Sequence, residues 1–188
     1  LVIATNRNDV LHRMLTTGTY ARQPIEASLS PSMDISISSN FERLLFDLYD
    51  GDAAQINSLM TAFSQGEIHL SETALARAQT LFRSACISDD ETCEEIRAMW
   101  EKTGELLDPH TAIGTRAARQ CLRDGEGPMV TLATAHPAKF PVAVAKANTG
   151  QEPVLPPHLA DLFDREERFD TLDNDLPTVH AYMAEQCL

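Results

Sequence analysis

The sequence predicts an α/β protein that contains part of an open, mostly parallel sheet flanked by helices, with a helical insert and a wrapping C-terminal tail. Short continuous apolar runs at residues 1–5 and 127–133 are typical of strands covered on both faces. Stretches with helical spacing and helix-capping residues separate them. Strands that alternate with helices in this way favour a parallel sheet.

Residues 1–50 are expected to form two strand-helix pairs. The first strand is "LVIAT", after which Asn8 is a candidate cap for a helix with one apolar face. The second strand is "MDISIS", residues 33–38. It precedes a predicted capping box of Ser39 with Glu42 and a helix with apolar residues at helical spacing, which are Phe41, Leu44, Leu45 and Leu48.

Residues 51–104 show helical spacing throughout and are expected to form a helical layer or insert. Three apolar faces mark three helices, and the last of them begins with a capping box of Ser88 and Glu91. The second face is predicted from Leu75, Ala78, Leu81, Phe82 and Ala85. The aromatic residues of this helical region are expected to pack in the protein core and not to contact a cofactor.

Residues 105–149 are expected to form a helix, a strand and an irregular loop. Asp108 followed by Pro109 is the favoured order at a helix start. The run "GPMVTLA" is the next predicted buried strand. Because Pro141 cannot donate inside a helix, a regular helix is expected to begin near Pro141, which leaves residues 134–140 as a loop. Residues 150–188 are proline-rich and acidic, and form the C-terminal extension.

Composition excludes several classes of function. A net charge of −13 disfavours nucleic acid and anionic membranes as partners, and no apolar run is long enough to span a membrane. The cysteines lack metal-ligand spacing and are expected to be reduced packing residues, which are Cys86, Cys93, Cys121 and Cys187. The chain is therefore expected to be soluble and cytoplasmic, without a metal. Because it opens directly on a buried type of strand, it is also expected to be a fragment.

The stretch "TLATAHPAKF" is the main candidate for a site. In an open α/β sheet, ligands bind beyond the carboxyl ends of the strands, where Thr134 is predicted to lie. The loop that follows offers the imidazole of His136 and the ammonium group of Lys139. Taken alone, a strand-end threonine and a turn histidine fit a purely structural loop as well.

Four motifs, in order, carry a family resemblance: "LVIATNRND", "LSPSMDISISSNFERL", "DPHTAIG" and "TLATAHPAKF". Together with the ending "LDNDLPTVHAYM", they resemble the C-terminal portion of threonine synthase, a pyridoxal 5'-phosphate (PLP) enzyme of fold type II. Residues 51–87 match that family only as a generally helical region. The resemblance implies that residues 1–50 and 105–149 belong to the PLP-binding catalytic domain.

The resemblance implies conversion of O-phosphohomoserine and water to threonine and phosphate. It also implies that a hydroxyl at the position of Thr134 meets the cofactor's ring nitrogen, in the place of the carboxylate that some other PLP folds use. His110 and His136 are the other expected cofactor-binding residues. Lys139 and Arg43 are candidate substrate-binding residues, because an anionic substrate in an acidic protein needs local positive charge. Asn6 is the third candidate, because it is expected at another strand end that faces the same cleft.

One departure from the family pattern limits these expectations. The lysine that holds the cofactor and the glycine-rich loop that binds its phosphate lie upstream of the matched region, so no catalytic residue is assigned in this chain. The chain alone is expected to be unable to catalyse the full reaction. It is expected to need the N-terminal part of the same enzyme as a partner. The alternatives left open are an inactive remnant that serves as an interaction module and a related fold type II PLP lyase.

Overall fold

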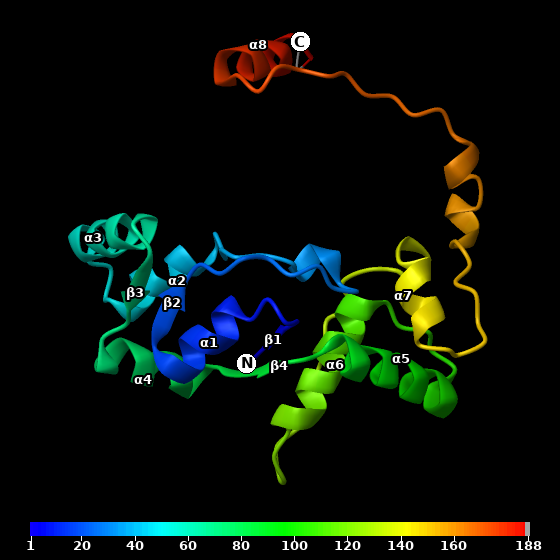
Figure 1. The fold of residues 1–188 in the computed structure, drawn as a ribbon, viewed down its shortest axis with the longest axis horizontal. Helices are drawn as coiled ribbons and strands as arrows, with labels where there is room; N and C mark the ends of the chain where they lie inside the picture. Colours follow the sequence, from blue (N-terminus) through cyan, green and yellow to red (C-terminus); the bar gives the residue numbers. More distant parts are fainter. Residues whose placement is uncertain (187–188) are drawn as a thin grey trace. The chain divides into compact units, whose positions relative to one another are not determined.

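The computed structural model describes residues 1–186 and divides them into two compact units, with the boundary between Val154 and Leu155 (Figure 1). The first unit is α/β, with helices around a small parallel pair of strands and a second, antiparallel pair. This confirms the predicted class at the level of α/β. A larger, mostly parallel sheet is not formed within the described residues.

The parallel pair joins the start of the chain to its middle. Strand β1 (Val2–Thr5) pairs with β4 (Arg83–Cys86), with Val2 opposite Arg83. Successive side chains of β1 point to opposite faces. Ile3 packs against the cluster that contains helix α1 (Val10–Thr17), whereas Val2 and Ala4 pack against the cluster that contains helix α6 (Pro109–Cys121). The pair is therefore enclosed between α1 and α6.

A second core lies around the antiparallel pair. Strand β2 (Thr19–Ala21) pairs with β3 (Glu67–His69), and helices α2 (Phe41–Leu48), α3 (Ala53–Ser64) and α4 (Glu72–Leu81) pack around them. Tyr20 is buried at its centre, with its ring stacked on Phe63 at 4.4 Å between centroids. Burial raises the pKa of the Tyr20 hydroxyl, which accepts a hydrogen bond from the backbone N–H of Ser38.

Helices α5 (Asp89–Thr103), α6 and α7 (Pro141–Lys146) form the remaining helical layer. The predicted capping box is confirmed: Ser88 Oγ accepts from Glu91 N, and Glu91 Oε2 accepts from Ser88 N. The latter bond is the main cause that lowers the pKa of Glu91. The predicted start of α6 at Asp108 and Pro109 and that of α7 at Pro141 are also confirmed.

The prediction of helix throughout residues 51–104 is wrong at two places, because β3 and β4 interrupt it. Helix α4 ends at Leu81, after which Phe82 is extended and the chain enters β4. Ala85 matched the spacing of the preceding helical face by coincidence. In the structure Ala85 and Ile87 are both buried, two residues apart, which is the period of a strand.

The predicted strand at residues 33–38 is also wrong. A short 3-10 helix (Pro31–Met33) is followed by irregular chain, in which Ile35 and Ile37 are exposed. Asp34 explains the difference, because its carboxylate accepts hydrogen bonds from Asn6 Nδ2 at 2.7 Å and from Ser28 Oγ at 2.6 Å. These bonds fold the segment back on itself and prevent it from extending along a sheet.

Two predicted helix caps in the first quarter are wrong as well. Helix α1 begins after Asp9 instead of Asn8, whose side chain instead donates to Glu26 O at 2.8 Å. Helix α2 begins after Asn40 without a side-chain cap, so Ser39 and Glu42 form no capping box. In the case of Asn8, a bond to a distant loop replaces the local cap that the sequence pattern offers.

The predicted buried strand at residues 127–133 does not form. This segment has no strand partner among the described residues, and Val130 and Leu132 are 79% and 78% exposed. An apolar run favours a strand only where a neighbouring strand can pair with its backbone. Residues 134–140 are irregular, as predicted, apart from a 3-10 turn at Pro137–Lys139.

The second unit contains two 3-10 turns (Pro157–Leu159 and Leu162–Asp164) and helix α8 (Leu176–Gln186). Asp175 accepts from Thr178 N and Oγ1 at the start of α8, and the hydroxyl bond is the main cause that lowers the pKa of Asp175. That this unit wraps the rest of the chain stays a prediction. None of the helices in residues 1–186 is long and apolar enough to cross a membrane.

Three cysteines within the described residues are free: Cys86, Cys93 and Cys121. Cys93 and Cys121 pack against buried clusters, and Cys86 Sγ donates to Asn6 O at 3.2 Å. Burial raises the pKa of the Cys86 and Cys93 thiols, so these groups stay protonated at neutral pH. Cys187 lies outside the described residues.

The core around α2 provides a test of the fold. Leu45 is fully buried, whereas the adjacent Phe46 is 43% exposed. We expect Leu45→Ala to lower the free energy of unfolding by about 2 to 5 kcal/mol, because it removes buried methyl groups and leaves a cavity. Phe46→Ala is the matched control and should cost much less. Denaturant unfolding measures both, and equal costs for the two variants would contradict the packing described here.

Candidate functional site

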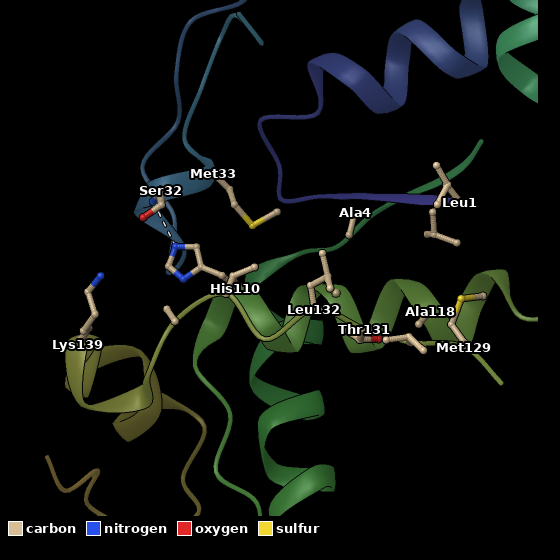
Figure 2. A pocket seen from close by; sticks show the side chains of 15 residues that line it. Leu1, Ala4, Ser32, Met33, His110, Ala118, Met129, Thr131, Leu132 and Lys139 are labelled. Carbon is tan, nitrogen blue, oxygen red and sulfur yellow. Dashed lines mark hydrogen bonds between the residues drawn. The ribbon is translucent and has the colours of Figure 1, made fainter. Parts of the chain in front are cut away.

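A cavity of about 670 Å³ lies between β1, the 3-10 helix at Pro31–Met33, α6 and the irregular segment 129–135 (Figure 2). One wall is apolar and contains side chains from all four elements, which are Leu1, Val2, Ala4, Met33, Ala118, Met129, Val130 and Leu132. Figure 2 shows His110, Ser32 and Lys139 together at one end of the cavity, far from Leu1 and Met129. An apolar cavity with a few polar groups at one end is typical of small-molecule sites.

His110 lies in the first turn of α6 and is 8% exposed. Its Nε2 accepts a hydrogen bond from the backbone N–H of Ser32 at 3.2 Å, so that nitrogen carries no proton. Nδ1 therefore carries the ring proton and donates it to Asp108 Oδ1 at 2.9 Å. The two contacts fix a neutral imidazole in one tautomer and one orientation at the edge of the cavity.

Asp108 holds the start of α6 and is 1% exposed. Its carboxylate accepts from the backbone N–H groups of His110 at 2.9 Å and Thr111 at 3.4 Å, which satisfies two of the unpaired donors of the first helical turn. The hydroxyl of Thr111 also donates to Asp108 Oδ2. A local capping residue thereby becomes the centre of a buried polar cluster beside the cavity.

Thr134 lies in the irregular segment and lines the cavity. Its backbone N–H donates to Thr111 Oγ1 at 3.2 Å. This bond connects the segment to the same cluster that orients His110. Thr134 and His110, two residues far apart in the sequence, are thus held at one end of the cavity through Thr111 and Asp108.

Lys139 completes the polar end of the cavity. It ends the 3-10 turn at Pro137–Lys139, and its Nζ lies 5.6 Å from the centroid of the Phe140 ring. The Phe140 ring in turn lies 4.5 Å from the His110 ring, with the planes tilted by 56°. The aromatic ring thus lies against both groups. The exposed ammonium group is free to meet an anion.

Gly114 allows α6 to approach the irregular segment closely. A Cβ atom at this position would lie 2.9 Å from Thr131 Cγ2, closer than carbon atoms of this kind approach one another. Because glycine has no side chain, residues 129–132 can lie directly against the helix and form part of the cavity wall. A larger residue here would push this wall away.

Three of the predicted site residues therefore line one cavity: Thr134, His110 and Lys139. His136 does not line it, and its Nδ1 accepts from Ala138 N at 3.2 Å as a cap of the 3-10 turn. Asn6 is 1% exposed and donates to Ser28, Ser30 and Asp34, which fastens the loop that leads to Ser32. Arg43 lines a different pocket, on α2 and α3.

Sequence reasoning did not identify Thr111 or Ser32. Thr111 stands three residues after a capping aspartate, a position that turns its hydroxyl back toward the cap, and this spacing was a usable signal. Ser32 acts through its backbone N–H, which no side-chain pattern indicates. The need for glycine at position 114 depends on a segment that returns to α6 from later in the chain.

The chain is similar to known proteins over nearly all of its length. A family model described as "Threonine synthase, C-terminal" matches residues 111–183, which include Thr111, Thr134 and Lys139. The threonine synthase of Pseudomonas aeruginosa is 52% identical over 186 residues, which is 98% of this chain and 40% of that protein. The chain thus spans about 40% of the length of the curated relatives it matches.

Two solved structures are similar as well. PLP-bound threonine synthase from Brucella melitensis has a TM-score of 0.88 and 47% identity, over 98% of this chain and 40% of that chain. Threonine synthase from yeast has a TM-score of 0.83 and 33% identity, over 100% of this chain and 42% of that chain. Both similarities extend over both units of the chain.

The contact between Gly114 and Thr131 provides a test of the cavity wall. Gly114→Ala favours the helix by about 1 kcal/mol but introduces overpacking of about 1 to 3 kcal/mol, so we expect a net loss of stability. Thr131→Ser removes the methyl group in conflict and keeps the hydroxyl. The double variant Gly114→Ala/Thr131→Ser should therefore be more stable than Gly114→Ala alone. Thermal unfolding decides, and a Gly114→Ala variant more stable than the unaltered protein would contradict the close approach.

Proposed function

We propose that the chain is the C-terminal part of a member of the threonine synthase family, an enzyme that converts O-phosphohomoserine and water to threonine and phosphate. The observation that carries this proposal is the convergence of Thr134, His110 and Lys139 on one cavity. These three residues come from two separate parts of the sequence and offer a hydroxyl, an oriented imidazole and an ammonium group. Such groups suit a substrate that carries both an amino acid and a phosphate.

The proposed cofactor is PLP, which the Brucella melitensis relative binds. When bound, PLP supplies an electron sink for reactions at the carbon atoms of an amino acid. The residues present fit its pyridine ring. The cavity of about 670 Å³ has an apolar wall against which a planar ring can lie, and Thr134 lines it, so that its hydroxyl can be placed to meet a ring nitrogen.

The partner of the ring nitrogen is proposed to be a neutral hydroxyl and not a carboxylate. Asp108 is the buried carboxylate nearest to Thr134 along the hydrogen-bond chain, but its oxygens already accept from His110 and Thr111. It is 1% exposed and does not line the cavity. Thr134 therefore meets the ring, and Asp108 supports the residues around it. A neutral partner leaves the ring nitrogen largely unprotonated.

Lys139 is proposed to bind the phosphate group of the substrate. An ammonium group beside an aromatic ring keeps a defined position and remains accessible to an anion. His110 is proposed to lie beside the cofactor ring, where its fixed orientation excludes water and aligns the loop that carries Ser32. Asn6 supports that loop by donating hydrogen bonds to Ser28, Ser30 and Asp34.

The lysine that holds the cofactor and the loop that binds its phosphate are proposed to come from the part of the enzyme that corresponds to the remaining length of the relatives. The exposed apolar side chains of Leu1, Val130 and Leu132 border the cavity and suit contact with that part. We also propose a cytoplasmic location. The free thiols Cys86, Cys93 and Cys121 agree with a reducing compartment.

Removal of the Thr134 hydroxyl tests the cofactor assignment. Thr134→Val keeps the β-branched shape, so in the full-length enzyme we expect folding to change little, while PLP retention weakens by about 1 kcal/mol. The absorbance of bound PLP should shift, and turnover should fall. Thr134→Ser keeps a hydroxyl and is the matched control. If Thr134→Val leaves spectrum and turnover intact, the assignment of Thr134 is wrong.

Lys139→Ala tests the phosphate assignment. In the full-length enzyme we expect productive substrate binding to weaken by about 1.5 to 3 kcal/mol, the value of a hydrogen bond to a charged group, with PLP content unchanged. Lys146 is an exposed lysine on α7 that does not line the cavity, so Lys146→Ala is the control. Steady-state kinetics on both variants decides. Equal effects of the two substitutions would exclude a specific role for Lys139.

A further inference from the structure

We propose that Thr111 is a positioning residue that holds Thr134 at the cavity through one hydrogen bond. Its Oγ1 accepts from the backbone N–H of Thr134 at 3.2 Å while its proton goes to Asp108 Oδ2. Thr111 does not line the cavity, so it acts through Thr134 and not on a ligand. This inference rests on the proposed function, because it concerns the residue assigned to the cofactor ring.

The direction of each hydrogen bond in the cluster is determined. Ser32 N–H occupies Nε2 of His110, so Nδ1 carries the proton and donates to Asp108. Asp108 therefore receives donors at both oxygens and acts as an acceptor, as an ionised carboxylate does. The hydroxyl of Thr111 must give its single proton to Asp108. Its lone pairs then remain to accept the N–H of Thr134.

The segment that carries Thr134 has little else to hold it. Residues 127–135 form no strand pairing within the described chain. Among the hydrogen bonds of residues 1–186, the one from Thr134 N–H to Thr111 is the bond that ties this segment to another part of the chain. Packing of Thr131 against Gly114 supports it three residues earlier. Loss of the bond would leave the position of residue 134 poorly defined.

The Thr111 hydroxyl is not needed for the helix itself. The backbone N–H groups of His110 and Thr111 already bind Asp108, which is the cap that α6 requires. The Thr111 hydroxyl is not part of this cap. It is buried and accepts a hydrogen bond from the segment that carries Thr134, and we infer that it positions this segment. Because Thr111→Val also removes a donor from Asp108, the positioning role is read from the amide of Thr134 and the cofactor spectrum and not from stability.

The experiment compares Thr111→Val, which removes the hydroxyl at nearly constant shape, with Thr111→Ser, which keeps it. Thr115→Val is the matched control, because Thr115 lies one turn later on α6 and its hydroxyl bonds to Ala112 O. The first readout is the exchange rate of the Thr134 amide proton with solvent in the full-length, cofactor-free enzyme with ¹⁵N-labelled threonine. The second is the absorbance of bound PLP in each variant and in the double variant Thr111→Val/Thr134→Val.

We expect Thr111→Val to speed exchange at the Thr134 amide by roughly 2- to 12-fold, the equivalent of one lost hydrogen bond, with little change for Thr111→Ser and Thr115→Val. The PLP absorbance of Thr111→Val should shift in the direction of Thr134→Val. In the double variant, the two changes should not add, because both act on the same contact.

Other outcomes overturn the inference. They are unchanged exchange in Thr111→Val, additive spectral changes in the double variant, or an equal effect of Thr115→Val. If Thr111→Val does not fold, the unaltered enzyme still decides: exchange at Thr134 as fast as at the exposed amides of the same segment excludes the bond. An unaltered enzyme that takes up no PLP would refute the proposed function. The amide exchange of Thr134 would then still test the bond on its own.

Discussion

The Asp108 carboxylate, buried at the N-terminus of α6, is the group on which the polar end of the cavity depends. It accepts from the backbone and ring of His110 and from the backbone and hydroxyl of Thr111. A buried charge is tolerated only when its oxygens are satisfied, so its neighbours must keep this arrangement. The cap that starts the helix is thus also the constraint that orients the site.

Helix α6 connects this constraint to the core. Its buried residues Ile113 and Ala117 pack with Val2 and Ala4 of β1, so the helix axis is set by the parallel pair. Its small residues Gly114 and Ala118 face the cavity. One helix therefore carries a core face, a cavity face and a polar N-terminus. A change in the packing of β1 against α6 would move all three together.

Charge is distributed unevenly with respect to the site. The chain carries a net charge of −13, yet Lys139 stands at the cavity and the carboxylates of the site are engaged with donors. Other ion pairs join α5 to α6, as between Arg119 and the buried Glu95. A single exposed cation is a modest contributor to stability. Its accessibility at the end of a largely apolar cavity matters more, because there it can meet an anion.

The sequence by itself determined the features that depend on neighbouring residues. The capping box at Ser88, the start of α6 at Asp108 and the start of α7 at Pro141 are local, and all three were predictable. The family resemblance put forward Thr134, His110 and Lys139 as site residues, together with His136, Asn6 and Arg43. Long-range contacts were not predictable. The strand β4 was hidden by a coincidental helical spacing, and "MDISIS" is held in a loop by Asp34.

The tertiary structure alone decided which candidates share a cavity. Of the six candidates, Thr134, His110 and Lys139 line it, whereas His136, Asn6 and Arg43 do not. Thr111 and Gly114 gained their roles from a segment that begins about fifteen residues later in the sequence. Helix caps arise from bonds within one turn and can be read from spacing. A cavity arises where distant segments meet, and their meeting is set by which apolar faces bury one another across the whole chain.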